Sequence, residues 1–497
     1  MQQTLPQPVL GILKALEKAG FDAHIVGGSL RDILLSRDPK DWDITTNAKP
    51  EEIQNIFPES VYENDFGTVG VKVPRFLSTT PETQETDIIE VTTYRVESNY
   101  TDARHPDKVQ FTDSLEQDLS RRDFTVNAMA GKLVKDELIL VDPFQGEKDL
   151  KEKLIRAVGN PEERFTEDAL RMLRAVRFLV ELGKKKKEGE LDWRIEEKTL
   201  AALQKLSENI AKISIERVQD EFSKIILSLN PSEGIELLEK VGLLQYIIPE
   251  LREGIGVTQN LHHVYTVWEH NVKALATCPS KKLSVRLAAL LHDVAKPRTK
   301  RGEGYNSTFY NHDHVGGRMA KKILERLRYP TKVVEHASLL VDQHLFYYNV
   351  GEVTEASVRR LLKRVGPENM DDLMAVRIGD RLGSGVPKAK PYKLRHLEYM
   401  IDKVSNDPVS VKMLKVNGKD LMDELGEKPG PKIGAILDCL LAEVIDDPKK
   451  NERPILLDRA RELMDNDLHV LRDMAKEVIE EKREEDDRSI KGRHHVE

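Results

Sequence analysis

The stretch Ala23-His24-Ile25-Val26-Gly27-Gly28-Ser29-Leu30-Arg31-Asp32, followed by Asp41-Trp42-Asp43-Ile44, decides the fold of the first part of the chain. The apolar run at 23–26 predicts a short strand that ends in a glycine pair, and 29–35 predicts a helix with Ser29 as its N-cap. Residues 41–44 predict a second strand, in which Asp41 and Asp43 project from one face and Trp42 from the other. The stretch therefore predicts a mixed α/β unit with two carboxylates and a glycine turn at one edge.

Further strands are expected at 67–73 and 87–94, and residues 9–16 have the spacing of an amphipathic helix. After residue 148 the spacing is helical almost to the end, apart from the lysine run at 183–187, which predicts a solvated loop, and an acidic, solvated last 37 residues. The expected fold class is α+β, with a mixed α/β head followed by helices. The expected domains are a catalytic head at 1–148, a helical neck at 149–255, a histidine-rich helical domain at 256–390 and a helical tail at 391–497.

Length and composition exclude several classes of protein. The 497 residues allow about three domains. Acidic residues outnumber basic ones by 85 to 77, which argues against a chain that coats nucleic acid through its overall charge. No apolar run approaches the length of a membrane span, and only Cys278 and Cys439 are cysteines. We therefore expect a cytoplasmic protein with no membrane partner and no disulfide framework.

The residues of the head have the chemistry of phosphoryl transfer. Two carboxylates on a rigid edge suit Mg²⁺, which fills its remaining positions with water and substrate phosphates. An isolated Asp-x-Asp is more often a turn, but here Gly27-Gly28 lies upstream, where backbone N–H groups at a helix start favour phosphate. The adjacent Arg121 and Arg122 predict a guanidinium fork for phosphate oxygens, with a surface ion pair as the alternative.

A carboxylate and a guanidinium one helical turn apart, Asp168 and Arg171, can select a base. Cytosine and adenine each offer an amino donor beside a ring-nitrogen acceptor, whereas guanine and uracil offer the reverse order. An Asp–Arg pair would therefore accept C and A and reject G and U. From these residues alone, the alternative is an ordinary salt bridge between positions i and i+3.

The motifs GGSLRD, DWD, RRDFTVNAMA, DPFQG and EDALRMLRAVRF occur in this order between about residues 20 and 250. Together they resemble the class II tRNA nucleotidyltransferases and bacterial poly(A) polymerases, although Ser29 stands where that family more often has Ala. The resemblance implies a polymerase-β-like head that binds Mg²⁺, CTP and ATP and extends an RNA 3′ end. The residues that it implies are Asp41 and Asp43 for Mg²⁺, Gly28, Arg31 and Arg122 for nucleotide or phosphate, and Asp168, Arg171, Arg174 and Arg177 for base selection and its flank. Two carboxylates suffice in this family, and Glu90 is a further candidate for a third.

The resemblance favours a complete CCA-adding enzyme acting on the tRNA 3′ end. A polar loop at 100–111 has full length, whereas family members with a shortened loop stop after CC. Poly(A) polymerases commonly carry a basic C-terminal extension, and this chain ends in an acidic one. The alternatives are a poly(A) polymerase, an enzyme that adds only CC or only A, and a catalytically silent head. Glycine-rich turns at 416–419 and 428–434 are candidate contacts to tRNA, or simple helix punctuation.

A second site is expected in the segment 262–344, which holds eight of the fourteen histidines. The order His270, His292-Asp293, Asp380 resembles the HD phosphohydrolases, with His312 and His344 as accessory ligands or phosphate contacts. His292 and Asp293 are expected on one helix about 100° apart, so that other helices must help them to meet at one metal. The resemblance implies a divalent transition metal and hydrolysis of 2′,3′-cyclic phosphates or other phosphomonoesters.

Overall fold

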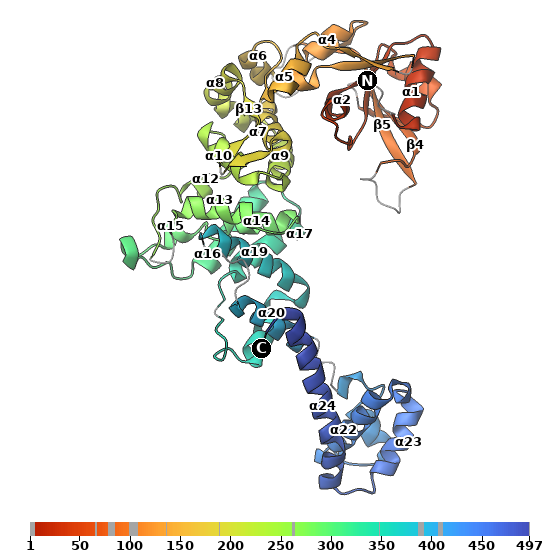
Figure 1. Cartoon of the computed structure of the whole chain (residues 1–497), viewed down its shortest axis with the longest axis vertical. Coiled ribbons are helices and arrows are strands. Elements are labelled where there is room, and N and C mark those ends of the chain that lie inside the picture. Colours follow the sequence, from red (N-terminus) through yellow and green to blue (C-terminus); the bar gives the residue numbers. More distant parts are fainter. Residues whose placement is uncertain are drawn as a thin grey trace. The chain divides into compact units, whose positions relative to one another are not determined.

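The computed structural model describes residues 5–64, 67–77, 85–98, 108–135, 137–187, 189–260, 264–346, 348–385, 392–405 and 411–496. The chain forms two compact units, Met1–His344 with Ala375–Gly385 and Leu345–Met374 with Val386–Glu497. Figure 1 shows the elements of both units along the chain. Most of the loop expected at 100–111, namely residues 100–107, lies outside the described residues.

The head contains a seven-stranded sheet in the order β3-β4-β5-β2-β1-β8-β9. Strands β2 and β5 are parallel, and every other neighbouring pair in the sheet is antiparallel. This arrangement places the start of β2 at the centre of the sheet, beside the end of β1. The strands are β1 (Ala23–Val26), β2 (Asp43–Thr46), β3 (Ser60–Asn64), β4 (Thr68–Pro74), β5 (Thr86–Thr93), β8 (Ala130–Val134) and β9 (Glu137–Val141), and a separate ribbon pairs β6 (Arg95–Ser98) with β7 (Lys108–Phe111).

Helices of the head complete its core. The amphipathic helix α1 buries Val9, Ile12, Leu13 and Leu16, as its spacing predicts. The prediction that Ser29 caps the second helix is wrong, because α2 already begins at Gly27. Ser29 is fully buried inside α2, where its hydroxyl donates to Val26 O at 2.8 Å. The helical elements are α1 (Gln7–Lys18), α2 (Gly27–Leu34), α3 (Pro50–Ile56), α4 (Leu115–Ser120), η1 (Thr125–Asn127) and α5 (Gly146–Glu152).

The rest of the first unit is mainly helical. The lysine run expected as a loop instead contributes β11 (Lys185–Lys187), which pairs with β12 (Glu190–Leu191) through a turn where Gly189 has φ +74°. A further two-stranded pair joins β10 (Leu154–Ile155) and β13 (Arg194–Ile195). The helices are α6 (Pro161–Glu167), α7 (Leu170–Leu182), α8 (Glu197–Leu206), η2 (Ser207–Lys212), α9 (Ile215–Leu227), α10 (Pro231–Lys240), α11 (Leu244–Ile247), α12 (Pro249–Arg252), α13 (Val267–Thr277), α14 (Leu283–Leu291), α15 (Lys296–Thr299), η3 (Gly304–Asn306), α16 (His312–Arg326), α17 (Thr331–Gln343) and the second part of α19 (Met370–Gly383).

The second unit has a core built around α22 and α24. The last residues, expected as a solvated tail, form the long helix α24, which buries Leu471, Ala475 and Ile479. In the tail, Asn417 caps α21 by accepting from Lys419 N, so that this N–H already has a partner. The elements are α18 (Glu355–Val365), η4 (Pro367–Asn369), α20 (Tyr392–Ser405), η5 (Val411–Met413), α21 (Gly418–Leu425), α22 (Pro431–Asp446), η6 (Pro448–Lys450), α23 (Arg453–Leu463), α24 (Leu468–His494) and the start of α19.

Among the described residues, no helix combines the length and apolar character needed to cross a membrane. Cys278 and Cys439 are both buried, one in each unit.

Candidate active site and metal centre

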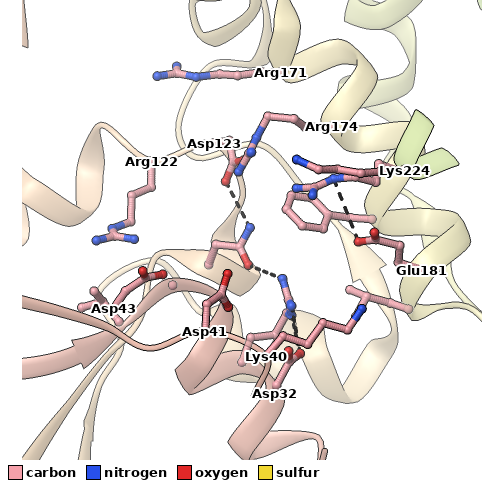
Figure 2. A pocket seen from close by; sticks show the side chains of 18 of the residues that line it. Asp32, Lys40, Asp41, Asp43, Arg122, Asp123, Arg171, Arg174, Glu181 and Lys224 are labelled. Atoms are coloured by element: carbon pink, nitrogen blue, oxygen red, sulfur yellow. Dashed lines mark hydrogen bonds and ion pairs between the residues drawn. The ribbon is translucent and has the colours of Figure 1, made fainter. Parts of the chain in front are cut away.

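A cavity of about 1310 Å³ opens between the sheet of the head and the helices α7 and α9. Figure 2 shows carboxylates of the head facing guanidinium groups of α7 across it. Every residue that the sequence predicts for nucleotide addition lines this one cavity, although the residues come from five separate segments of the chain. They are Gly28, Arg31, Asp41, Asp43, Glu90, Arg122, Asp168, Arg171, Arg174 and Arg177.

The two carboxylates lie where β2 begins, directly beside the turn that ends β1. Asp41 is exposed and Asp43 is half-buried, while the intervening Trp42 is buried, as the alternation predicts. Burial and the neighbouring Asp41 raise the pKa of Asp43 to about 6, against the opposing effect of Arg122. Glu90 on β5 is the register partner of Asp43. Two crowded carboxylates with a third beside them fit a hard divalent cation such as Mg²⁺.

Gly27 brings the backbone into contact with this carboxylate pair. Its φ is +68°, and a Cβ at this position would lie 3.0 Å from Asp43 Oδ2 and 3.2 Å from an Arg122 guanidinium nitrogen. A side chain is therefore disfavoured both by the backbone conformation and by the space. The glycine turn lets the start of α2, Asp43 and Arg122 approach one another.

We predict that Gly27→Ala raises the KM for the nucleotide and lowers kcat, because the methyl group must displace Asp43 and Arg122. The left-handed conformation also costs about 1–2 kcal/mol of stability for an L residue. Gly159→Ala is the matched control, since Gly159 has φ +66° but nothing within 4 Å of its Cβ position. Steady-state kinetics and thermal unfolding of both variants check the prediction. Equal kinetic losses in the two variants would assign the effect to backbone strain alone.

The two arginines predicted to bind phosphate together, Arg121 and Arg122, have different surroundings. Arg121 donates to Asp118 Oδ1 at 2.8 Å, which is a structural ion pair. Arg122 lies 3.5 Å from Asp118 Oδ2 and extends toward Asp43. Its Nε is buried and finds no hydrogen-bond partner among the residues that the structure describes. Of these two arginines, Arg122 therefore has an N–H donor at the cavity that can bind a ligand.

A chain of polar contacts links the head to α7. Arg31 donates to Asn127 Oδ1 at 2.9 Å, Asn127 donates to Asp123 Oδ1 at 3.2 Å, and Arg174 donates to Asp123 Oδ2 at 2.7 Å. Burial alone would raise the pKa of Asp123, but Arg174 holds it lower, at about 2. Asp123 therefore stays charged and fixes Arg174 at the cavity wall.

The Phe178 ring lies under three guanidinium groups. The distances to its centroid are 5.3 Å from Arg31, 5.2 Å from Arg174 and 4.5 Å from Arg177, within the range of cation–π attraction. Glu221 on α9 adds an ion pair to Arg177 at 2.9 Å. These contacts gather the positive charge of two elements on one side of the cavity.

Asp168 and Arg171 do not form the side-by-side pair that helical spacing predicts. Asp168 has extended backbone at the end of α6, and α7 begins only at Leu170, whose N–H donates to Asp168 Oδ1. Asp168 instead pairs with Arg217 of α9 at 2.7 Å, and Arg171 pairs with Glu167 at 2.7 Å. Both side chains nevertheless line the cavity. Because the chain is not helical between α6 and α7, the Asp168 carboxylate points toward Arg217 and not toward Arg171.

Several side chains at this site were missed by sequence reasoning. They are Asn127, Phe178, Arg217 and Glu221, which hold the arginines and Asp168 in place. Asn127 and Phe178 lie inside motifs that were identified, RRDFTVNAMA and EDALRMLRAVRF, so that only their roles were missed. Arg217 and Glu221 lie four residues apart on α9, and an i, i+4 Arg–Glu spacing on an amphipathic helix is too common to be a signal.

The histidine-rich segment brings its predicted ligands together in a second, buried cluster. His270 Nε2 lies 2.9 Å from His292 Nε2, 3.2 Å from Asp293 Oδ2 and 3.3 Å from Asp380 Oδ1. His312 and His344 face the other oxygen of Asp293. The elements that supply them are α13, the turn after α14, α16, the end of α17 and α19.

The local structure around His292 and Asp293 differs from the expectation of a continuous helix. Helix α14 ends at Leu291, so that His292 and Asp293 lie in a turn. In this turn His292 Nε2 lies 3.3 Å from Asp293 Oδ2. Burial would lower the pKa of His270, but Asp293 and Asp380 raise it to about 9. Buried imidazoles around two ionised carboxylates fit a divalent transition metal.

Known protein families match four segments of the chain. The poly A polymerase head domain matches 23–156, the probable RNA and SrmB-binding site of polymerase A matches 192–255, the HD domain matches 260–382 and a tRNA nucleotidyltransferase domain 2 matches 388–460. A CCA-adding enzyme of Ligilactobacillus salivarius is 33% identical over 92% of this chain and 96% of its own length. The chain belongs to the CCA-adding enzyme family. One from Enterococcus faecalis is 32% identical over 90% of this chain and 94% of its own.

Solved CCA-adding enzymes have the same fold. The crystal structure of the Bacillus stearothermophilus CCA-adding enzyme in complex with CTP is 27% identical, with a TM-score of 0.57 over 93% of this chain and 100% of that one. The Thermotoga maritima CCA-adding enzyme complexed with tRNA is 21% identical, with a TM-score of 0.51 over 92% and 96% of the two chains. The predicted resemblance and fold class are confirmed, and as a family member the chain is a nucleotidyltransferase.

Proposed function

We propose that this enzyme adds C, C and A to the 3′ end of tRNA, taking CTP and ATP in turn without a nucleic-acid template. The observation that carries the proposal is that one cavity is lined by the Asp41 and Asp43 carboxylates, by the Arg122 guanidinium and by the separately oriented Asp168 and Arg171. Mg²⁺ bound there would polarise the α-phosphate and neutralise developing charge. The tRNA 3′-hydroxyl attacks the α-phosphorus, the bond to the β-phosphate oxygen breaks, and pyrophosphate leaves.

In this proposal, different side chains hold the Mg²⁺ and the triphosphate. Asp41 and Asp43 hold the Mg²⁺, with Glu90 as a further carboxylate at its edge. Arg122 and Arg31 bind the triphosphate oxygens beside the Gly27-Gly28 turn at the start of α2. Catalysis in this scheme depends on orientation and charge neutralisation, as in phosphoryl transfer generally.

Base selection falls to Asp168 and Arg171 in their separate orientations. A carboxylate has about four acceptor positions, so Asp168 can accept from Arg217 and from an exocyclic amino group of C or A at the same time. Arg171 gives two of its nitrogens to Glu167, Arg164 O and Arg121 O, and a guanidinium has five N–H donors. Arg217 thus orients Asp168, while Arg174 and Arg177 flank the base.

We predict that Asp168→Ala lowers the preference for CTP over UTP by about tenfold to a hundredfold, because one bidentate base contact is worth roughly 1–3 kcal/mol. Glu163→Ala is the control, an exposed acid on α6 that does not line the cavity. The measurement is kcat/KM for each nucleotide on a tRNA that ends before the first C. An unchanged preference in the Asp168 variant would remove Asp168 from base selection.

Transcripts of one tRNA that end before C, after C, after CC and after CCA test the proposed product. With CTP and ATP together, each shortened transcript should grow to CCA and stop, and the complete one should stay unchanged. Long A tails from ATP alone would instead identify a poly(A) polymerase. A stop after CC, or addition of A only to the CC transcript, would identify a partial enzyme, and no extension would identify a silent head.

A second activity is favoured by the buried cluster around Asp293. We propose that His270, His292, Asp293 and Asp380 hold a divalent transition metal and that the cluster hydrolyses 2′,3′-cyclic phosphates or other phosphomonoesters. The metal would supply an activated water at neutral pH. The proposal rests on the convergence of the four side chains and on the family resemblance of the segment. Hydrolysis of a 2′,3′-cyclic nucleotide that a chelator abolishes would support it, and a protein that binds no transition metal would contradict it.

A further inference from the structure

The head buries one charged carboxylate, that of Asp118, directly behind the cavity. Asp118 lies near the end of α4, where the neighbouring Leu119 packs against β1 and β8, and its side chain is fully buried. It does not line the cavity, but Arg121 and Arg122, which contact it, both do. Burial alone would raise the pKa of Asp118, but these two guanidinium groups hold it below its ordinary value. The carboxylate is therefore kept charged inside the protein.

The two oxygens of this carboxylate face different arginines. Oδ1 accepts from Arg121 Nε at 3.0 Å, from Arg121 Nη2 at 2.8 Å and from the Arg95 backbone N–H at 3.3 Å. Oδ2 lies 3.5 Å from Arg122 Nη2. The Thr45 hydroxyl is 3.4 Å from Oδ2, but its single hydrogen has a nearer acceptor, a backbone carbonyl at 3.1 Å. Oδ1 thus anchors Arg121, and Oδ2 attracts Arg122.

Arg122 has acidic groups on two sides. Its Nη2 faces Asp118 Oδ2, whereas its Nη1 faces the Gly27 turn. Nη1 and Asp43 Oδ2 lie 3.2 and 3.0 Å from one point, the position that a Cβ on Gly27 would take. Figure 2 shows Arg122 and Asp43 on the same side of the cavity. The position of the guanidinium therefore depends on two competing carboxylates.

We propose that Asp118 is a positioning residue for nucleotidyl transfer, which holds the Arg122 guanidinium away from Asp43 and presents it to the triphosphate. The inference rests on the proposed role of Arg122 in binding triphosphate oxygens. Without Asp118, the guanidinium moves toward Asp43 and competes with the cation for that carboxylate. With Asp118 in place, the guanidinium is already oriented when the triphosphate arrives, so that less side-chain freedom is lost on binding.

The variant Asp118→Asn changes one side of this contact and keeps the other. An amide oxygen in the place of Oδ1 still accepts from Arg121 and from the Arg95 N–H. The amide nitrogen then stands in the place of Oδ2 and turns donor hydrogens toward the Arg122 guanidinium. The substitution therefore preserves the contacts that anchor Arg121 and removes the attraction on Arg122.

A double-mutant cycle between positions 118 and 122 tests the inference. We expect Asp118→Asn to raise the KM for CTP and the inhibition constant of inorganic pyrophosphate together by about tenfold, the worth of one hydrogen bond to a charged group. The KM for a tRNA that ends before the first C should stay unchanged, because Arg122 contacts the triphosphate only. In the Arg122→Ala background, Asp118→Asn should change neither constant further, since it has no guanidinium left to position.

Asp87→Asn is the matched control. Asp87 is another buried acid of the head, accepts from the backbone N–H groups of Phe76 and Leu77 at 2.6 and 2.8 Å, and does not line the cavity. Its replacement is expected to lower the thermal unfolding temperature without changing the KM for CTP or the inhibition constant of pyrophosphate. Should Asp118→Asn fail to fold, the cycle is run with Asp118→Ser, which is smaller and also removes the charge.

The outcomes separate this inference from the proposed function. If Arg122→Ala changes neither constant, the triphosphate role of Arg122 is wrong, and the inference falls with it. If Arg122→Ala raises both constants but the substitution at 118 raises neither, only the positioning role is overturned. The same holds if the effect of the substitution at 118 persists in full in the Arg122→Ala background. Equal shifts in Asp87→Asn would also overturn it, because they would assign the loss to reduced stability.

Discussion

Replacing Asp43 by asparagine is expected to lower the rate of nucleotide addition by about three orders of magnitude or more, because the cation loses a charged ligand worth several kcal/mol in the transition state. The side chain keeps its shape, and burial together with Asp41 already disfavours the charged form of Asp43. The free energy of unfolding should therefore stay the same or rise. Single-turnover incorporation of CMP at saturating Mg²⁺ is the measurement, paired with thermal unfolding.

Two comparisons sharpen that experiment. Asp22→Asn is the matched control in the same unit, since Asp22 pairs with Lys132 at 2.9 Å and does not line the cavity. Asp41→Asn should match Asp43→Asn in rate, because both carboxylates serve one ion in the proposed scheme. Incorporation by either variant within about tenfold of the unsubstituted enzyme would remove that residue from the metal site.

In the head, the hydropathy patterns of short segments correctly predicted strand β1 and the burial of Trp42. Strand β1 has the bounds that its apolar run predicts, and the alternation around Trp42 correctly gave a buried ring between two carboxylates at the cavity. The strand expected at 41–44 begins only at Asp43, so that Asp41 and Trp42 precede β2, although their burial alternates as a strand's would. The combination of five motifs in a fixed order then identified the family, which none of them could do alone.

Positions where a helix starts or ends were predicted less well, and two candidate site residues, Asp168 and His292, lie at such positions. Ser29 was expected as a cap and is buried in α2, while Asp168 and His292 were expected inside helices and lie at their ends. Helix ends depend on tertiary contacts that spacing does not encode. Asp168 is an example, because its partner Arg217 is 49 residues away.

Partners from distant segments were beyond the reach of the sequence pattern for the same reason. The order of the histidines suggested one metal with accessory ligands, but it does not show that His312 and His344 face a different oxygen of Asp293 from His270. That division depends on how α13, α16 and α17 pack around one turn. It becomes visible only in three dimensions.

Asp293→Asn is expected to lower the proposed hydrolysis of 2′,3′-cyclic phosphates by about three orders of magnitude, while nucleotide addition stays within about twofold. The amide lacks the charge to bind a cation and cannot accept through both of its ends. Lys296, which is buried and pairs with Asp293 at 2.6 Å, also loses its partner, so we expect the unfolding free energy to fall by about 3 kcal/mol. Nucleotide addition by the same preparation reports whether the first unit is still folded.

The matched control for this variant is Asp342→Asn, a half-buried acid on α17 whose partner is the exposed His314. It removes a carboxylate from the same helical segment without touching the cluster. Both variants are assayed against a 2′,3′-cyclic nucleotide and against a shortened tRNA, with and without chelator. Hydrolysis that persists unchanged in Asp293→Asn would place the activity outside this cluster, because a metal held there cannot dispense with its central carboxylate. Parallel loss of nucleotide addition would instead mean that the turn after α14 is needed for the fold of the first unit.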